Sequence, residues 1–116
     1  MTKISLLFRI LTLAALGVVL VMSLRPSINV GSISHIDKLL HLGAYAVLAG
    51  LSRIGWPKIW GGWLFLFWAV FGIAIEILQH MMALGRTGSL ADIFANLTGA
   101  GIALALFHIL WTRHQP

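Results

Sequence analysis

Residues 60–84, WGGWLFLFWAVFGIAIEILQHMMAL, decide the fold class of this chain because Glu76 is their only Asp, Glu, Lys or Arg residue. A run of this length and composition is typical of a membrane-spanning helix, which needs about 20 apolar residues. Three further apolar runs cover about residues 4–24, 34–56 and 89–111. The sequence therefore predicts an all-α integral membrane bundle of four transmembrane helices, joined antiparallel because the connections are short.

Composition supports a single membrane domain over residues 1–116. Hydrophobic residues make up 59% of the chain and charged residues 9%, with a mean hydropathy of +0.97. Cysteine is absent, which excludes disulfides and thiolate chemistry. The net charge of +5 comes from basic residues scattered singly between apolar runs, so it indicates topology signals and lipid contacts. The expected partner is the lipid bilayer and not nucleic acid.

The distribution of Lys and Arg predicts the orientation, since cytoplasmic loops carry the excess of these residues. One set of helix ends holds five basic residues and the other holds three: Lys3, Arg9, Arg53, Lys58 and Arg113 against Arg25, Lys38 and Arg86. Both termini are therefore expected in the cytoplasm (N-in, C-in). A cleaved signal peptide is the alternative for the first run, but no convincing small-x-small cleavage site follows it.

All three acidic residues of the chain, Asp37, Glu76 and Asp92, fall inside or at the mouth of apolar runs. Carboxylates at membrane depth are costly, and by default they indicate a functional site. Each belongs to a spaced polar motif: Asp37-x3-His41-x3-Tyr45, Glu76-x2-Gln79-His80, and Arg86-x2-Ser89-x2-Asp92-x3-Asn96. With four antiparallel spans, all three motifs converge on one membrane face, which the orientation makes extracytoplasmic.

A structural role is open for two of the acids. Ser34-x-x-Asp37 and Ser89-x-x-Asp92 both have the form of a capping box, which stabilises a helix N-terminus. Glu76 has no such explanation, because it lies about 12 Å before its helix end at 1.5 Å per residue. Glu76 is therefore the sharpest indication of a site.

The remaining polar residues leave alternatives open. Asn96 shares a helix face with the small residues Gly99 and Ala103, so it could join helices or contact a ligand. A zinc or manganese site is the less favoured alternative, because no local metal motif is present and three helices would have to supply the ligands. Its candidate ligands are Asp37, His41, Glu76, His80 and Asp92. No metal and no cofactor is expected.

Three motifs in this order resemble the VanZ-like membrane protein family: Asp37-Lys38-x-x-His41-x-x-x-Tyr45-x-x-Leu48, Gly72-x3-Glu76-x2-Gln79, and Arg86-x2-Ser89-x2-Asp92-x3-Asn96-x2-Gly99. The resemblance covers about residues 37–103, with a small departure at Leu42, where relatives often carry an aromatic residue. The family is named for a protein linked to teicoplanin resistance. The resemblance implies a membrane topology, a setting in the bacterial cell envelope, a link to glycopeptide resistance, and the motif residues as the site.

The leading hypothesis is a multi-pass protein of the bacterial inner membrane whose outer polar pocket binds a lipid head group or lipid-linked glycan precursor. Arg86 and Lys38 would face a phosphate, and Glu76 with His41 would supply proton chemistry or sugar hydrogen bonds. The other expected ligand-binding residues are Asp37, Tyr45, Gln79, Ser89, Asp92 and Asn96. Whether a reaction follows stays open, as does a homo-oligomer. The alternatives are a small proton-coupled transporter or exporter, and a structural subunit that stabilises a partner complex.

Overall fold

A computed structural model describes residues 2–25, 34–82 and 90–113, without the side chains of residues 34–37 and 112–113. These residues form four helices and no strand: α1 (Lys3–Ser23), α2 (Ser34–Gly55), α3 (Gly61–Met82) and α4 (Leu90–Arg113). The predicted all-α bundle is confirmed, and every predicted helix boundary lies within two residues of the observed one.

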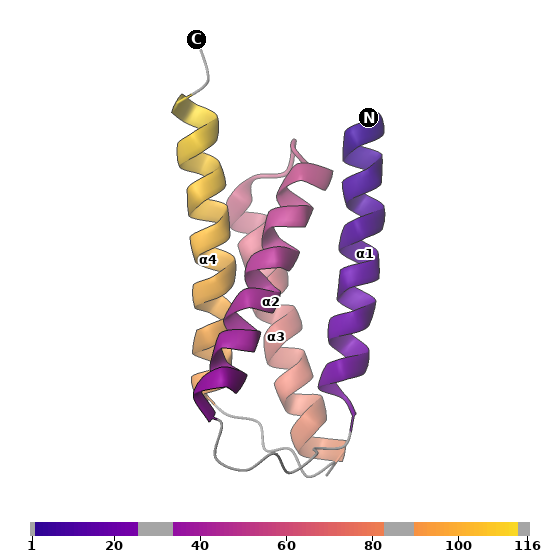
Figure 1. The fold of residues 1–116 in the computed structure, drawn as a ribbon, viewed down its shortest axis with the longest axis vertical. Coiled ribbons are helices and arrows are strands. Elements are labelled where there is room, and N and C mark those ends of the chain that lie inside the picture. Colours follow the sequence, from indigo (N-terminus) through magenta and orange to yellow (C-terminus); the bar gives the residue numbers. More distant parts are fainter. Residues whose placement is uncertain (1, 26–33, 83–89, 114–116) are drawn as a thin grey trace.

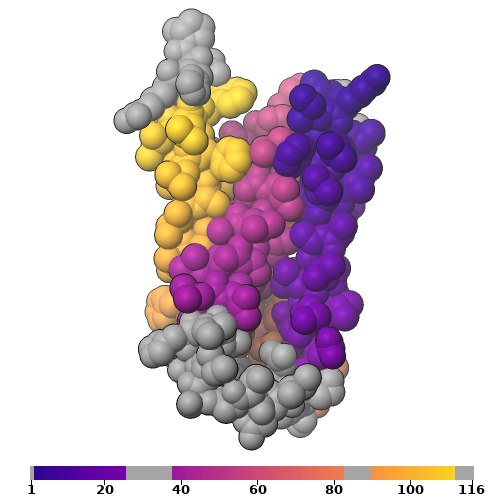
Figure 2. Space-filling view, in the orientation of Figure 1, coloured from indigo at the N-terminus to yellow at the C-terminus, as the bar shows by residue number. Residues whose placement is uncertain are grey.

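Helix α2 lies at the centre of the bundle and contacts each of the other three helices. Figure 2 shows it between α1 and α4 along the length of the molecule, while α3 lies behind it in Figure 1. The N-terminal end of α1 and the C-terminal end of α4 share one end of the bundle with the α2–α3 connection (Figure 1). We call this the tryptophan end, because it carries Trp56, Trp60, Trp63 and Trp111.

The surface has the polarity expected of a membrane protein. Helices α1, α3 and α4 each contain a stretch that is long and apolar enough to cross a membrane. Large apolar side chains point outward along all three, for example Leu13, Val70 and Ile109. Polar side chains are instead buried: Ser5, Thr12, Ser52, Glu76, Gln79, Asp92 and Asn96. An apolar exterior with these polar side chains buried inside suits a lipid solvent, in which a polar group must find its partner inside the bundle.

Helix α2 has the length of a span but a more polar composition, and its position explains this difference. It is 22 residues long, as α3 is. At 1.5 Å per residue this length corresponds to about 33 Å, close to the thickness of a bilayer core. Because α2 contacts all three other helices, polar side chains on its inner faces can meet protein instead of lipid.

The apolar core lies in the middle of the bundle, where small and large residues alternate between helices. It comprises Tyr45, Leu48, Ala49, Leu64, Trp68, Ala100, Ala103 and Leu104. Trp68 is its largest member, and its indole Nε1 donates a hydrogen bond of 3.0 Å to Ser52 Oγ. That bond satisfies the polar atom of an otherwise apolar side chain, which burial requires.

Two helices pack closely where Gly99 of α4 meets Leu42 of α2. A Cβ atom built on Gly99 would collide with the Leu42 carbonyl group, whose carbon would lie 2.9 Å away. Small residues permit such contacts between helices in lipid, as the spacing of Gly99 and Ala103 predicts. Glycine at position 99 therefore sets the separation of α2 and α4.

At the tryptophan end, Arg9 of α1 joins the C-terminus of α2. Its Nε donates a 2.7 Å hydrogen bond to the carbonyl of Gly55, and its guanidinium lies 5.1 Å from the centre of the Trp56 ring. The last carbonyls of a helix have no partner within it, so the arginine satisfies one of them. The bond ties α1 to the bundle at this end.

We predict that Gly99→Ala lowers the free energy of unfolding by about 1–3 kcal/mol, because the added methyl group forces α2 and α4 apart. The measurement is the thermal unfolding midpoint of the purified protein in detergent. Gly43→Ala is the matched control, since a Cβ at Gly43 meets no atom within 4 Å. Equal midpoints for the Gly99→Ala variant and the wild type would contradict the role given to this contact.

Candidate functional site

The site lies at the end of the bundle opposite the tryptophans, where three helices each contribute two residues four positions apart. These pairs are His41 and Tyr45 on α2, Gly72 and Glu76 on α3, and Asp92 and Asn96 on α4. Positions i and i+4 share one helix face. Since α3 runs antiparallel to α2 and α4, the pairs form two layers. The layer nearer the helix ends holds His41, Glu76 and Asp92, and the deeper one holds Tyr45, Gly72 and Asn96.

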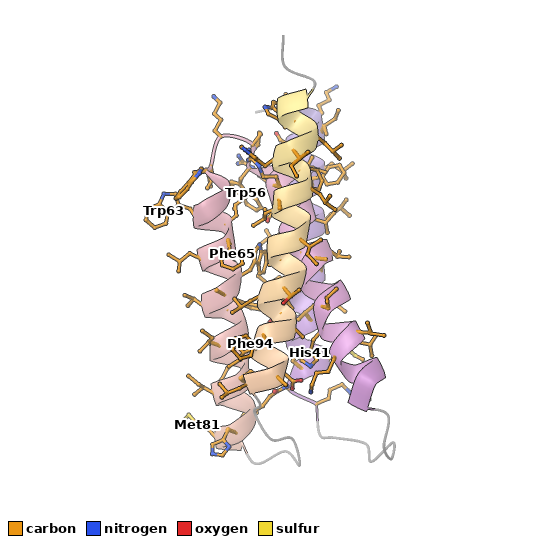
Figure 3. All side chains as sticks on the ribbon, turned by 90° about the vertical axis from the view of Figure 1, so that its left-hand side faces the viewer. His41, Trp56, Trp63, Phe65, Met81 and Phe94 are labelled. Carbon is orange, nitrogen blue, oxygen red and sulfur yellow. The ribbon has the colours of Figure 1, made fainter. Side chains whose placement is uncertain are left out.

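The layer nearer the helix ends is charged, and we call its residues, together with Lys38, the polar cluster. Lys38 Nζ forms an ion pair with Asp92 Oδ1, which joins α2 to α4. The other carboxylate oxygen of Asp92 lies 3.8 Å from His41 Nε2. Glu76 is only 4% exposed, and its Oε1 is inaccessible to solvent. Figure 3 shows His41 facing α4 at the end of the molecule opposite Trp56 and Trp63.

Three of the residues considered as metal ligands from the sequence come together here. His41, Glu76 and Asp92 each offer a ligand atom, and these three atoms lie within 4.8 Å of one another. His80, one turn beyond Glu76 on α3, is exposed. The side chain of Asp37 lies outside the described part of the chain.

The deeper layer positions the imidazole of His41. Its Nδ1 lies 3.0 Å from Oδ1 of Asn96, which is 2% exposed. Because an amide oxygen only accepts hydrogen bonds, the tautomer that fits this contact carries its proton on Nδ1 and leaves the lone pair on Nε2. Gly72 makes room for this arrangement, since a Cβ there would lie 3.2 Å from Asn96 Nδ2 and 3.2 Å from the Tyr45 ring.

The other predicted site residues divide into two groups. Gln79 is buried, and its Nε2 donates a 2.7 Å hydrogen bond to the carbonyl of Ser23. Ser23 is the last residue of α1, so this bond ties α1 to α3 in the way that Arg9 ties it to α2. Arg86 and Ser89 lie outside the described residues, and the structure gives their side chains no place.

Two apolar grooves lead to the polar cluster from the outside of the bundle. One has a volume of about 270 Å³, lies between α3 and α4, and has Glu76 and His80 in its wall. The rest of its wall is apolar: Ile73, Ile77, Met81, Leu90 and Ile93. The second, of about 190 Å³, lies between α1 and α2 and reaches His41 and Tyr45.

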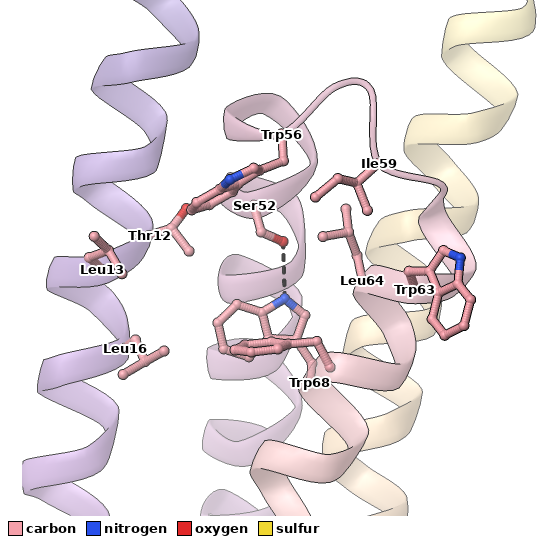
Figure 4. Close-up of a pocket in the computed structure, with 10 residues that line it drawn as sticks. Thr12, Leu13, Leu16, Ser52, Trp56, Ile59, Trp63, Leu64 and Trp68 are labelled. Atoms are coloured by element: carbon pink, nitrogen blue, oxygen red, sulfur yellow. Dashed lines mark hydrogen bonds between the residues drawn. The ribbon is translucent and has the colours of Figure 1, made fainter.

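A separate pocket at the tryptophan end has almost no polar wall. It occupies about 350 Å³ between α1, α2 and α3, and Trp56, Trp63 and Trp68 contribute to its lining (Figure 4). Its few polar groups are already bonded within the helices, since Thr12 donates to the carbonyl of Phe8 and Ser52 to that of Ala49. The residues that line this pocket offer no acid–base or metal chemistry.

Sequence reasoning missed the direct partners of two site residues. It assigned Lys38 to a phosphate and Gln79 to a ligand, whereas the structure pairs Lys38 with Asp92 and Gln79 with a backbone carbonyl. The sequence alone does not show which residue pairs with a lysine one turn before a site histidine. It does not single out the carbonyl of Ser23 either, because every residue has a backbone carbonyl.

Comparison with known proteins does not assign the chain to a family. The chain matches no protein-family model, no curated protein and no solved structure. The resemblance to VanZ-like proteins therefore rests on the motif residues alone.

We predict that Lys38 and Asp92 are energetically coupled. Lys38→Gln and Asp92→Asn should each lower the unfolding midpoint, and the double variant should lose less than the sum of the two. The coupling free energy should be about 1 kcal/mol, because the Lys38 side chain is 37% exposed and water weakens the pair. A double-mutant cycle measured by thermal or denaturant unfolding tests this. Strictly additive losses would show that the pair does not hold α2 against α4.

Proposed function

We propose that this chain is a multi-pass protein of the bacterial inner membrane that binds the phosphate-bearing head group of a lipid or lipid-linked envelope precursor. The observation that carries the proposal is the polar cluster itself, in which a lysine, a histidine and two carboxylates meet where apolar grooves open to lipid. The VanZ-like motifs support the same setting and link it to glycopeptide resistance.

The shape of the grooves favours a ligand with an apolar tail. In the groove between α3 and α4 the wall is apolar except at Glu76 and His80. A chain of methylene groups gains contact with such a wall, and the polar residues then select the group at its end. The ligand class that combines both features, and that surrounds this protein in any case, is a membrane lipid.

The charges at the rim of the cluster favour an anionic head group. Lys38 is more exposed than Asp92, with 37% of its side chain accessible against 10%. Its ammonium group therefore lies on the outer side of the ion pair, where it can also meet a phosphate oxygen. Lysine binds phosphate as a compact point charge, while the neighbouring carboxylates and imidazole can bond to hydroxyl groups of a sugar.

The proposal includes four spans with both termini in the cytoplasm. The common end shared by the α1 N-terminus, the α2–α3 connection and the α4 C-terminus supports the four spans, because four spans require this arrangement (Figure 1). The excess of Lys and Arg at that end favours the cytoplasmic side for it. The polar cluster then faces the extracytoplasmic side, where envelope precursors are used.

We predict that the protein purified from bacterial membranes carries a lipid enriched over the bulk membrane, and that Glu76→Gln and Lys38→Gln reduce its amount about tenfold. Mass spectrometry of lipids extracted per mole of protein gives the readout. His108→Ala is the control, since His108 lies in a groove at the tryptophan end. The same samples are assayed for abundance and unfolding midpoint.

Two outcomes would overturn this function. One is a lipid content equal to that of the bulk membrane in the wild type. The other is a variant that loses lipid only in proportion to its lost stability, which would support the structural-subunit alternative. Retained stability with lost lipid supports binding.

The topology gives a separate prediction, helped by the absence of native cysteine. Single cysteines at Thr2 and Ile59 mark the tryptophan end, and one at Leu90 marks the other end. In intact spheroplasts, a membrane-impermeant maleimide should label only the cysteine at position 90. All three should react after the membrane is permeabilised. Labelling at position 2 or 59 before permeabilisation would contradict the proposed orientation.

A further inference from the structure

We infer that His41, Glu76 and Asp92 form a binding site for one divalent transition-metal ion of the zinc or manganese class. The three side chains come from three different helices, yet their ligand atoms lie within 4.8 Å of one another. Glu76 and Asp92 are buried and His41 is half-buried. An imidazole nitrogen with two carboxylate oxygens is a donor set that suits these ions.

The orientation of His41 matches that of a metal-ligating histidine. Its Nδ1–H donates to Asn96 Oδ1 at 3.0 Å, which leaves Nε2 as the ring atom directed toward Asp92. Metal-bound histidines usually donate their second N–H to a carbonyl or carboxylate, which fixes the tautomer and the ring plane. Asn96 performs this function for His41, and Gly72 leaves the space in which Asn96 does so.

The ligand atoms lie slightly farther apart than they would around a bound metal ion. Rotation of the side chains can close this difference. Ligands about 2.1 Å from a tetrahedral ion lie about 3.4 Å from one another. The distance from His41 Nε2 to Asp92 Oδ2 is 3.8 Å, too long for a hydrogen bond and close to that value. The helices can keep their positions while the carboxylates turn inward.

Lys38 is the competitor of the metal. Its ammonium group is paired with Asp92, so in the structure described here a cation of the protein itself occupies one side of the site. Metal binding requires this side chain to withdraw from Asp92, which its exposure permits. Removal of the Lys38 charge distinguishes a structural ion pair from a metal site, because it weakens the ion pair and increases the affinity of the metal site.

This inference goes beyond the proposed function, since metal binding can be measured without any lipid ligand. With three protein ligands, an ion of this class keeps an open coordination position. A phosphate oxygen or a water molecule could occupy it. If the protein binds lipid without metal, or metal without lipid, one proposal holds and the other fails.

The experiment uses the full chain, purified in detergent, stripped with a chelator and titrated with Zn²⁺ alone and with Mn²⁺ alone. Isothermal titration and elemental analysis give the affinity and the stoichiometry. We expect one tight ion per chain, with affinity reduced about tenfold or more in His41→Ala and Asp92→Asn and reduced in Asn96→Ala. Lys38→Gln should bind at least about threefold more tightly than the wild type, because it removes the competing charge.

His108→Ala is the matched control, because this exposed histidine lies in a groove at the tryptophan end, away from His41, Glu76 and Asp92. It should bind as the wild type does. The tighter metal binding expected of Lys38→Gln cannot result from misfolding, because a variant that fails to fold does not gain metal affinity. The inference is overturned if Zn²⁺ and Mn²⁺ bind equally to wild type and His41→Ala, if binding is lost only in His108→Ala, or if Lys38→Gln binds no more tightly than the wild type.

Discussion

The close contact between Gly99 of α4 and the Leu42 carbonyl of α2 is the constraint on which the polar end depends. His41 precedes Leu42, and Asn96 lies almost one turn before Gly99, so the contact that fixes the helix separation also brings the imidazole and the amide within hydrogen-bond distance. Any larger residue at position 99 would move α2 and α4 apart, and with them the imidazole and the amide. In an apolar medium a buried amide or imidazole without a partner is costly, so the packing contact and the polar bonds reinforce each other.

The bundle divides its length between two kinds of chemistry. At the tryptophan end the pocket wall is apolar, and Arg9 bonds to a helix end and an aromatic ring. At the other end, Lys38, His41, Glu76 and Asp92 gather, and two grooves on the outside of the bundle reach His41 and Glu76. This asymmetry favours binding at one membrane face over a path through the membrane. It counts against the transporter alternative for the part of the chain that the structure describes.

Much of this arrangement could be predicted from the sequence, because it follows from periodicity. Apolar runs of membrane length located the helices, and the spacing of His41, Glu76, Asp92 and Asn96 placed them at one end once the helices were antiparallel. Pairings between helices could not be predicted, because they depend on helix rotation. Examples are Lys38 with Asp92 and Gln79 with Ser23. The sequence also made a metal site improbable because three helices had to converge, and the structure shows that His41, Glu76 and Asp92 do converge.

The central claim is that polar side chains of α2, α3 and α4 meet inside one end of a membrane bundle. Magic-angle-spinning NMR in lipid bilayers tests it most directly, with ¹⁵N-labelled histidine and ¹³C-labelled asparagine. The account predicts a through-space cross-peak between the His41 ring nitrogen and the Asn96 amide carbon that disappears in Asn96→Ala. A second sample, labelled with ¹⁵N-tryptophan and ¹³C-serine, provides the Trp68–Ser52 contact of the apolar core as a reference. Absence of the His41–Asn96 peak while the reference contact is observed would contradict the account.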